Sequence, residues 1–180
     1  MNQIKSHPKL IKYILILVVL FGIVFVGIRI LSSRKAPKPT VQGATSVQKH
    51  QDINKEFTFP VDTNTKMKFV VENAELDNQI VIKGQEASAV PGRTFLIISL
   101  KITNDFNQSI QINTRDYVRL TVNKNENELL APDIHNDPVE VQAISTKYTR
   151  VGFPVNTSDH DFVLQIGEIK GDKQKISLNL

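Results

Sequence analysis

The sequence predicts an all-β, immunoglobulin-like β-sandwich preceded by a single transmembrane α-helix. One long apolar run lies near the start of the 180-residue chain, a polar stretch follows it, and short runs of alternating apolar and polar residues fill the rest. Such alternation, broken about every ten residues by turn formers, is typical of a sandwich or barrel. We therefore divide the chain into a short cytoplasmic tail (1–9), a transmembrane helix (10–31), a flexible tether (32–55) and the sandwich domain (56–180).

The predicted span is apolar except for Lys12 and Arg29, which lie near its two ends. At about 1.5 Å per residue, a helix over 10–31 is roughly 33 Å long, enough to cross a hydrocarbon core of about 30 Å. The two basic side chains can reach the headgroups, and membrane lipid is the expected partner of the helix. The positions that mark the span are Leu10, Tyr13, Phe21, Arg29 and Leu31.

A buried core helix and a cleaved signal peptide are the alternatives to a retained anchor. A core helix would have a polar face, and residues 13–28 have none. A signal peptide has an apolar region of about 7 to 15 residues followed by small residues at the cleavage point. Here the apolar run is longer, and Ala36 is followed by Pro37. Cleavage would yield a secreted form of the domain, and it stays open as an alternative.

Basic residues flank both ends of the span, so the positive-inside rule does not decide its orientation. A first helix behind a basic leader usually acts as a signal-anchor, and long domains translocate largely regardless of their charge. We therefore expect a single-pass protein of the cell membrane with its C-terminal domain extracytoplasmic.

The charge distribution argues against nucleic acid as a partner. From Val41 onward the chain has 15 basic and 18 acidic residues, a net charge of −3, although the whole chain has a net charge of +4. The basic excess therefore belongs to the flanks of the helix, where each charge near anionic headgroups is worth about 1 kcal/mol.

Residues 32–55 are rich in Ser, Thr, Gln, Lys and Pro and lack apolar periodicity, which is typical of a flexible spacer. The candidate strands beyond this spacer run over 56–61, 66–76, 79–82, 94–104, 110–113, 117–123, 128–131, 146–155, 162–166 and 175–180.

Side chains alternate across a strand, so the inward faces can be named. In the central strand the apolar face consists of Leu96, Ile98, Leu100 and Ile102. Three later strands repeat this pattern, with Val118, Leu120 and Val122, then Phe162, Leu164 and Ile166, and then Ile176, Leu178 and Leu180. We expect strand 175–180 to be paired in a sheet, and two such apolar faces to pack together.

Four segments resemble the small bacterial telokin-like immunoglobulin domains: PGRTFLIISLKITND, YVRLTV, STKYTRVGFPVNTSDHDFVLQIGE and KISLNL. The resemblance rests on Gly92 before a long strand that ends at Asn104, and on Val151, Phe153 and Val155 in a later strand. It implies an exported domain of unknown function, akin to an immunoprotective extracellular antigen, and no catalytic residues. The lipid-attachment cysteine common in that family is absent, and the transmembrane helix would replace it.

The segment PDIHNDP places Asp133, His135 and Asp137 at alternate positions, a pattern that could hold a divalent cation. The same residue types form exposed turns, which is the simpler interpretation. Asp159, His160 and Asp161 are adjacent in sequence, and three successive side chains rarely converge on one ion. We assign no metal site.

Catalytic motifs are also absent from the sequence. The chain has no cysteine and no Gly-x-Ser-x-Gly elbow, so we expect no catalytic residues, no cofactor and no enzyme activity. The leading hypothesis is a non-catalytic binding or adaptor module of the bacterial cell envelope, whose partner is a protein or a wall polymer. The polar loop 130–144 is the expected contact region. The alternative is an accessory subunit of a membrane complex that acts through its helix.

Overall fold

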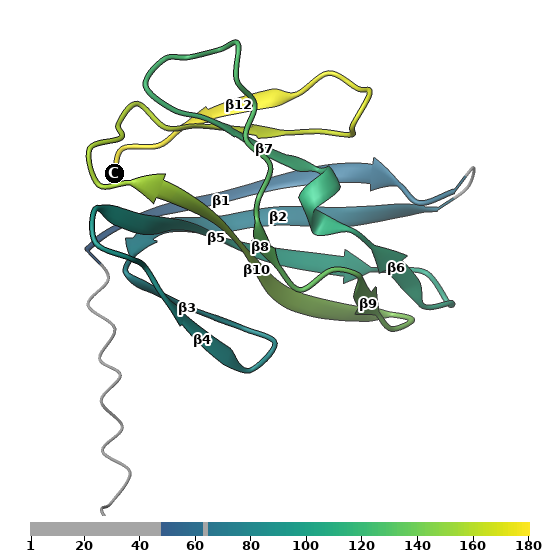
Figure 1. Cartoon of the computed structure of the whole chain (residues 1–180). Coiled ribbons are helices and arrows are strands. Elements are labelled where there is room, and N and C mark those ends of the chain that lie inside the picture. The colour runs from purple at the N-terminus through teal and green to yellow at the C-terminus, as the bar shows by residue number, and fades with distance from the viewer. Residues whose placement is uncertain (1–47, 63–64) are drawn as a thin grey trace, which may run out of the picture. The chain divides into compact units, whose positions relative to one another are not determined.

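The computed structural model describes residues 48–62 and 65–180, and this part of the chain is a β-sandwich (Figure 1). The larger layer is an antiparallel five-stranded sheet. Its strands, in spatial order, are β1 (Lys49–Pro60), β2 (Lys66–Asp77), β5 (Arg93–Asn104), β10 (Ser145–Asn156) and β8 (Ile134–His135).

Three further sheets complete the fold. A three-stranded sheet forms the second layer, in the order β12 (Gln174–Ser177), β11 (Val163–Ile166) and β7 (Val118–Thr121). Two-stranded ladders join β3 (Gln79–Ile82) to β4 (Gln85–Ser88), and β6 (Ile110–Ile112) to β9 (Val139–Val141). One 3-10 turn, η1 (Thr114–Asp116), precedes β7. Figure 1 shows the three-stranded sheet on one side of the five-stranded sheet and the β3–β4 hairpin on the other.

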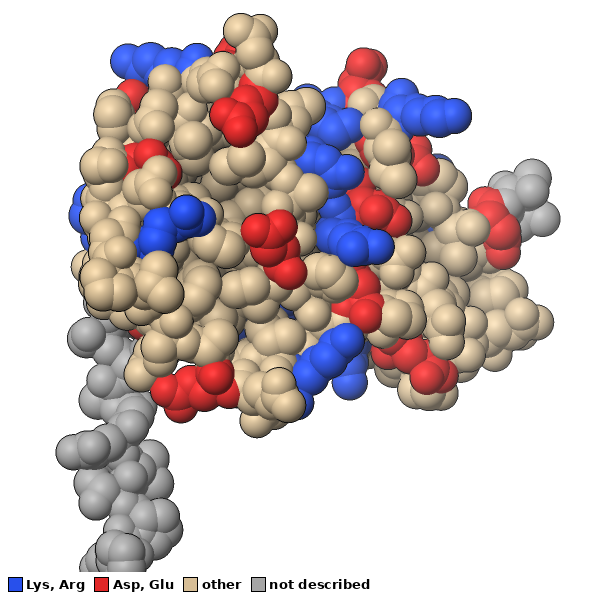
Figure 2. All heavy atoms as spheres, in the orientation of Figure 1, with Lys and Arg blue, Asp and Glu red and all other residues tan. Residues whose placement is uncertain are grey.

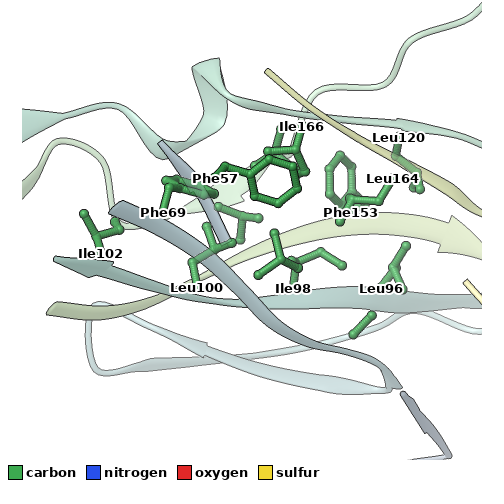
Figure 3. Close-up of a cluster of buried hydrophobic side chains, with 14 of the residues drawn as sticks. Phe57, Phe69, Leu96, Ile98, Leu100, Ile102, Leu120, Phe153, Leu164 and Ile166 are labelled. Atoms are coloured by element: carbon green, nitrogen blue, oxygen red, sulfur yellow. The ribbon is translucent and has the colours of Figure 1, made fainter. Parts of the chain in front are cut away.

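The main core lies between the five-stranded and the three-stranded sheet (Figure 3). The predicted inward face of the central strand β5 is confirmed, because Leu96, Ile98, Leu100 and Ile102 have no exposed surface. Leu120, Leu164 and Ile166 face them from the three-stranded sheet and are equally buried. Full burial of one such side chain contributes about 1.5–3 kcal/mol, so these alternating strands specify the sandwich.

An aromatic cluster closes one end of this core. The ring of Phe59 meets Phe69 edge-on at 5.7 Å and Tyr117 at 4.7 Å between centroids. Phe57 stacks on Phe59 at 6.3 Å. These contacts join β1, β2 and the start of β7, and therefore hold the two layers together at this end.

A second, smaller core lies on the outer side of the five-stranded sheet. Ile80 of the β3–β4 hairpin packs on Phe95 and Ile97, which point outward from β5. The hairpin approaches β10 so closely that a Cβ built on Gly152 would lie 2.8 Å from Cδ1 of Ile80. The hairpin thus covers one end of the outer face, and a side chain at position 152 would require the Ile80 side chain to move.

The first strand differs from the prediction, because β1 begins at Lys49 and residues 49–55 had been placed in the tether. These residues pair with β2 as far as the Lys49–Leu76 pair, around a β-bulge between Asp52 and Lys55. Their side chains are mostly polar on both faces, so periodicity did not reveal the strand. The backbone pairing and the packing of Ile53 on the core hold it instead.

Three other differences concern short elements. Residues 128–131 form no strand, only the bridge between Leu120 and Leu130. Strands β8 and β9 lie within 130–144, which was predicted as an irregular loop. Strand β4 was missed because its four residues are all exposed, and the positive φ of Lys83 (52°) and Gly84 (74°) closes the hairpin.

The prediction that strand 175–180 is paired in a sheet is confirmed, because β12 pairs with β11. The N–H of Leu178 donates to the carbonyl of Phe162 at 2.9 Å, and the Leu178 side chain is buried. Ile176 and Leu180 pack against the same core, which is the face that the alternation indicated.

Candidate binding surface

The five positions that mark the predicted membrane span, Leu10, Tyr13, Phe21, Arg29 and Leu31, lie outside the described residues. In the part of the chain that the structure describes, no helix is long and apolar enough to cross a membrane.

The structure brings together two of the three candidate ligands of the PDIHNDP segment, His135 and Asp137. Nδ1 of His135 lies 3.3 Å from Oδ2 of Asp137, and it accepts a hydrogen bond from the Asp137 backbone N–H at 3.2 Å. The carboxylate of Asp137 is buried and accepts three hydrogen bonds from Thr114 and Arg115. Asp133 is exposed. Asp137 therefore holds η1 in place through its hydrogen bonds with Thr114 and Arg115.

The residues at 159–161 form a clamp between two loops. Oδ2 of Asp159 accepts from the backbone N–H of Asn156 at 2.8 Å, and Oδ1 accepts from Nδ2 of Asn123 at 2.9 Å. Asn123 in turn accepts from the His160 N–H at 3.0 Å and donates its own N–H to the His160 carbonyl. Partial burial opposes ionisation, but these hydrogen bonds outweigh it and lower the pKa of the Asp159 carboxyl below 3.8.

Across residues 48–62 and 65–180, no three His, Cys, Asp or Glu side chains are grouped so that they could hold a metal ion. This finding includes the two sets of candidate ligands named from the sequence: Asp133, His135 and Asp137, and Asp159, His160 and Asp161.

The most distinctive surface is the outer face of the five-stranded sheet where the β3–β4 hairpin leaves it open. Outward side chains form rows across β2, β5 and β10, and one row runs from Asn73 through Ser99 to Arg150. In the next row Tyr148 of β10 lies opposite Lys101 of β5, and 63 % of the Tyr148 surface is exposed. This is the polar face of an otherwise alternating strand, so an exposed ring here is unusual.

Two adjoining hollows flank Tyr148. One, of about 530 Å³, lies on the outer face and is lined by Glu72, Asn73, Val81, Ser99, Asn136, Tyr148 and Arg150 among others. The other, of about 560 Å³, runs along the edge of β10 to β9 and is lined by Asn136, Glu140, Gln142, Ser145, Lys147, Tyr148 and neighbouring residues. Both are lined by Asn136, Tyr148 and Thr149, so the hollows adjoin, and we call them together the Tyr148 groove.

Asn136 fixes the wall of this groove. Its Nδ2 donates to Oγ1 of Thr149 at 3.1 Å, and its Oδ1 accepts from the backbone N–H of Lys83 at 3.1 Å. The ammonium of Lys83 donates to the Asp137 carbonyl at 3.4 Å. The β3–β4 turn, the β8–β9 segment and β10 are thus tied together beside Tyr148.

Asn73 stands out among the polar groups of the groove. Its Oδ1 is buried and has no hydrogen-bond partner among the described residues. Asn73 follows a β-bulge in β2, where the register with β5 shifts between Val71 and Asn73. Such an unpaired buried acceptor costs about 1–3 kcal/mol, and this cost sets Asn73 apart from the other polar residues of the groove.

A third hollow, of about 530 Å³, lies at the aromatic end of the main core. It is lined by Asp116, Tyr117, Glu168, Ile169, Lys170 and Gly171. Burial, followed by the carboxylates of Glu168 and Asp116, raises the pKa of the Tyr117 hydroxyl above 10.0. The ammonium of Lys173 donates to the carbonyls of Glu168 and Ile169, so two carbonyls of this loop are paired within the loop.

Basic and acidic side chains are interspersed over the surface that Figure 2 shows, without a large patch of one sign. This matches the small net charge of the domain, and this side of the surface has no basic patch of the kind that binds a polyanion.

Sequence reasoning missed the Tyr148 groove. The outward position of Tyr148 could have been found, because it directly precedes Thr149, which lies on the buried face of a predicted strand together with Val151 and Phe153. The unpaired Oδ1 of Asn73 could not have been predicted, because a bulge leaves no signal in a single sequence. The predicted contact region, 130–144, contributes Asn136, Glu140 and Gln142 to the groove.

No protein family matches the sequence, and no curated protein matches it significantly. The chain is similar to an uncharacterized β-sandwich protein from Clostridium difficile 630, with 15 % identity over 72 % of this chain and 95 % of that one and a TM-score of 0.51. This likeness shows the fold, a β-sandwich.

Two further solved structures are similar to the chain. A conserved hypothetical protein from Bacillus anthracis has 13 % identity, covers 71 % of this chain and 96 % of its own, and has a TM-score of 0.48. A functionally unknown protein from Listeria monocytogenes EGD-e has 10 % identity, covers 76 % of this chain and 88 % of its own, and has a TM-score of 0.47.

Proposed function

We propose that this protein is a non-catalytic binding module of the bacterial cell envelope, held at the outer side of the membrane by residues 10–31. The observation that carries the proposal is the exposed ring of Tyr148, set in a groove whose polar groups include an unpaired buried acceptor. A rigid sheet that presents one aromatic side chain and several unengaged polar groups is suited to recognition.

The domain is of the immunoglobulin-like type and belongs with the telokin-like domains that the sequence resembles. The face-to-face packing of two antiparallel sheets and the likeness to a bacterial β-sandwich support this assignment.

Photo-crosslinking on intact cells tests the binding role. A photoreactive amino acid replaces Tyr148 in the full chain, and a matched variant carries it at Ile169, which is 60 % exposed and lies in the third hollow. We expect a discrete adduct from position 148 and none from position 169. Equal labelling from the two positions, or none from either, would contradict a binding role for the Tyr148 groove.

Protease treatment of intact cells tests the anchoring. We expect an external protease to remove the domain and leave a short membrane-embedded fragment that contains residues 10–31. Recovery of a soluble form that begins after residue 31 in the culture medium would contradict the anchor and favour the secreted form.

Exchange of residues 10–31 for an unrelated transmembrane segment separates this proposal from an accessory subunit that acts through its helix. A binding module keeps its adduct at position 148 after the exchange, because the groove is unchanged. Loss of the adduct would favour the accessory subunit.

A further inference from the structure

We infer that the Tyr148 groove binds an uncharged saccharide chain, an inference that rests on the proposed binding function and names its ligand class. Five groups of the groove supply the argument: the side chains of Glu72, Asn73, Ser99, Tyr148 and Arg150.

The polar groups are unengaged. In the described part of the chain, the side chains of Glu72, Ser99 and Arg150 form no hydrogen bond or ion pair, and Oδ1 of Asn73 has no partner. Surface side chains elsewhere do pair, as Lys175 does with Glu126 at 2.7 Å. The groove thus offers a carboxylate, an amide, a hydroxyl and a guanidinium to a ligand.

The charges of the groove favour a neutral ligand. Glu72 and Arg150 carry opposite charges in the same hollow, so neither a phosphate nor a cation would find a field of one sign. A carboxylate accepts and a guanidinium donates two hydrogen bonds side by side, which suits neighbouring hydroxyl groups. The Ser99 hydroxyl and the Asn73 amide line the same hollow and can exchange hydrogen bonds with further ligand hydroxyls.

The ring of Tyr148 supplies the apolar part of the site. Its neighbour across the sheet is Lys101, and most of the ring is exposed. A pyranose ring has one face of C–H groups and a rim of hydroxyls, so it can cover an aromatic face while its rim reaches polar side chains. A single ring of this kind supplies contact area without requiring an enclosed cavity.

The shape of the groove favours a chain over a single sugar. The hollows of about 530 and 560 Å³ adjoin at Asn136, Tyr148 and Thr149, and the second extends along the edge of β10 to Glu140 and Gln142 of the β9 segment. A polymer that passes Tyr148 would therefore contact both sides of this edge, with its weak contacts summed along its length.

The test is a titration of the full chain in lipid nanodiscs with a panel of uncharged oligosaccharides of hexose and N-acetylhexosamine, followed by calorimetry. We expect at least one tetramer to bind, Tyr148→Ala to weaken it at least tenfold, and Tyr148→Phe to keep most of the affinity. Asn73→Leu should weaken binding while retaining the circular dichroism spectrum of the parent. The control Ile169→Ala, in the third hollow, should leave affinity unchanged.

Binding of no panel member, or equal binding by Tyr148→Ala, overturns the inference. If no saccharide binds and position 148 still forms an adduct with a protein on cells, the ligand class is wrong and the proposed binding function stands. If extended peptides bind instead of saccharides, and Tyr148→Ala weakens that binding, the ligand class is likewise wrong and the proposed binding function stands.

Discussion

The carboxylate of Asp137 receives two hydrogen bonds from one residue, Thr114: one from the backbone N–H at 2.7 Å and one from the hydroxyl at 2.6 Å. The backbone N–H of Arg115 donates to the other oxygen at 3.0 Å. Removal of the carboxylate leaves these donors unpaired in a buried place. We expect Asp137→Ala to lower the free energy of unfolding by roughly 2–4 kcal/mol, measured by urea denaturation of the full chain in detergent micelles.

The matched control for that change is Asp133→Ala, in the same segment. Asp133 is exposed, so its replacement should change the free energy of unfolding by less than about 0.5 kcal/mol. Similar losses in the two variants would contradict a specific role for Asp137.

Gly152 permits the close approach of the β3–β4 hairpin to β10. A Cβ there would lie 2.8 Å from Cδ1 of Ile80 and 3.3 Å from Cβ of Ile134. We expect Gly152→Ala to cost about 1–3 kcal/mol of the free energy of unfolding through overpacking. Ile80→Val removes the nearer atom, so the double variant should lose less than the sum of the two single losses. Strict additivity in this double-mutant cycle would show that the two residues do not clash.

Leu178 joins β12 to the main core. Its side chain is 6 % exposed, and its N–H donates to Phe162. Truncation to alanine should cost roughly 2–4 kcal/mol, and deletion of 174–180 should unfold the domain. The exposed Ile169 is the control, and Ile169→Ala should be nearly neutral. Thermal unfolding followed by circular dichroism compares the variants, and an unchanged melting temperature in Leu178→Ala would contradict this role.

The hydrogen bonds to the Asp159 carboxyl should make part of the domain's stability depend on pH in the acid range. Because hydrogen bonds lower the pKa of this carboxyl in the folded protein, its contribution to stability is complete above pH 3.8 and is lost as the pH falls through the lower folded-state pKa. The Asp159→Asn variant lacks this carboxyl, so its free energy of unfolding should fall less than that of the parent protein between about pH 5 and about pH 2. Urea midpoints across this range make the comparison, and parallel profiles for the two proteins would rule out the effect.

The sandwich was predictable wherever strands alternate cleanly. Leu96 to Ile102 and Phe162 to Ile166 place their apolar side chains as the pattern required, since burial on one face leaves a period of two in the sequence. Residues 49–55 and β4 left no such trace. Their pairing depends on backbone hydrogen bonds and on a turn with positive φ at Lys83, which composition does not encode.

The candidate site was less predictable than the fold. The spacing of Asp133, His135 and Asp137 suggested ligands, but the nearest donors to the Asp137 carboxylate belong to residues 114 and 115, far away in sequence. The groove arises from Asn73 of β2, Asn136 between β8 and β9, and Tyr148 of β10, which meet only through the pairing of the strands. Long-range placement of this kind requires the folded structure.

The outer hairpin has a consequence for the motions of the domain. It rests on three buried apolar side chains, Ile80, Phe95 and Ile97, and on its link to Asn136. So small a cluster should open locally at a far lower free energy than the whole domain, and its amide hydrogens should exchange with solvent first. Because Val81 of the hairpin and Asn136 also line the groove, an occupant beside Tyr148 would slow that exchange, and the exchange rate of the hairpin amides would show whether the groove is occupied.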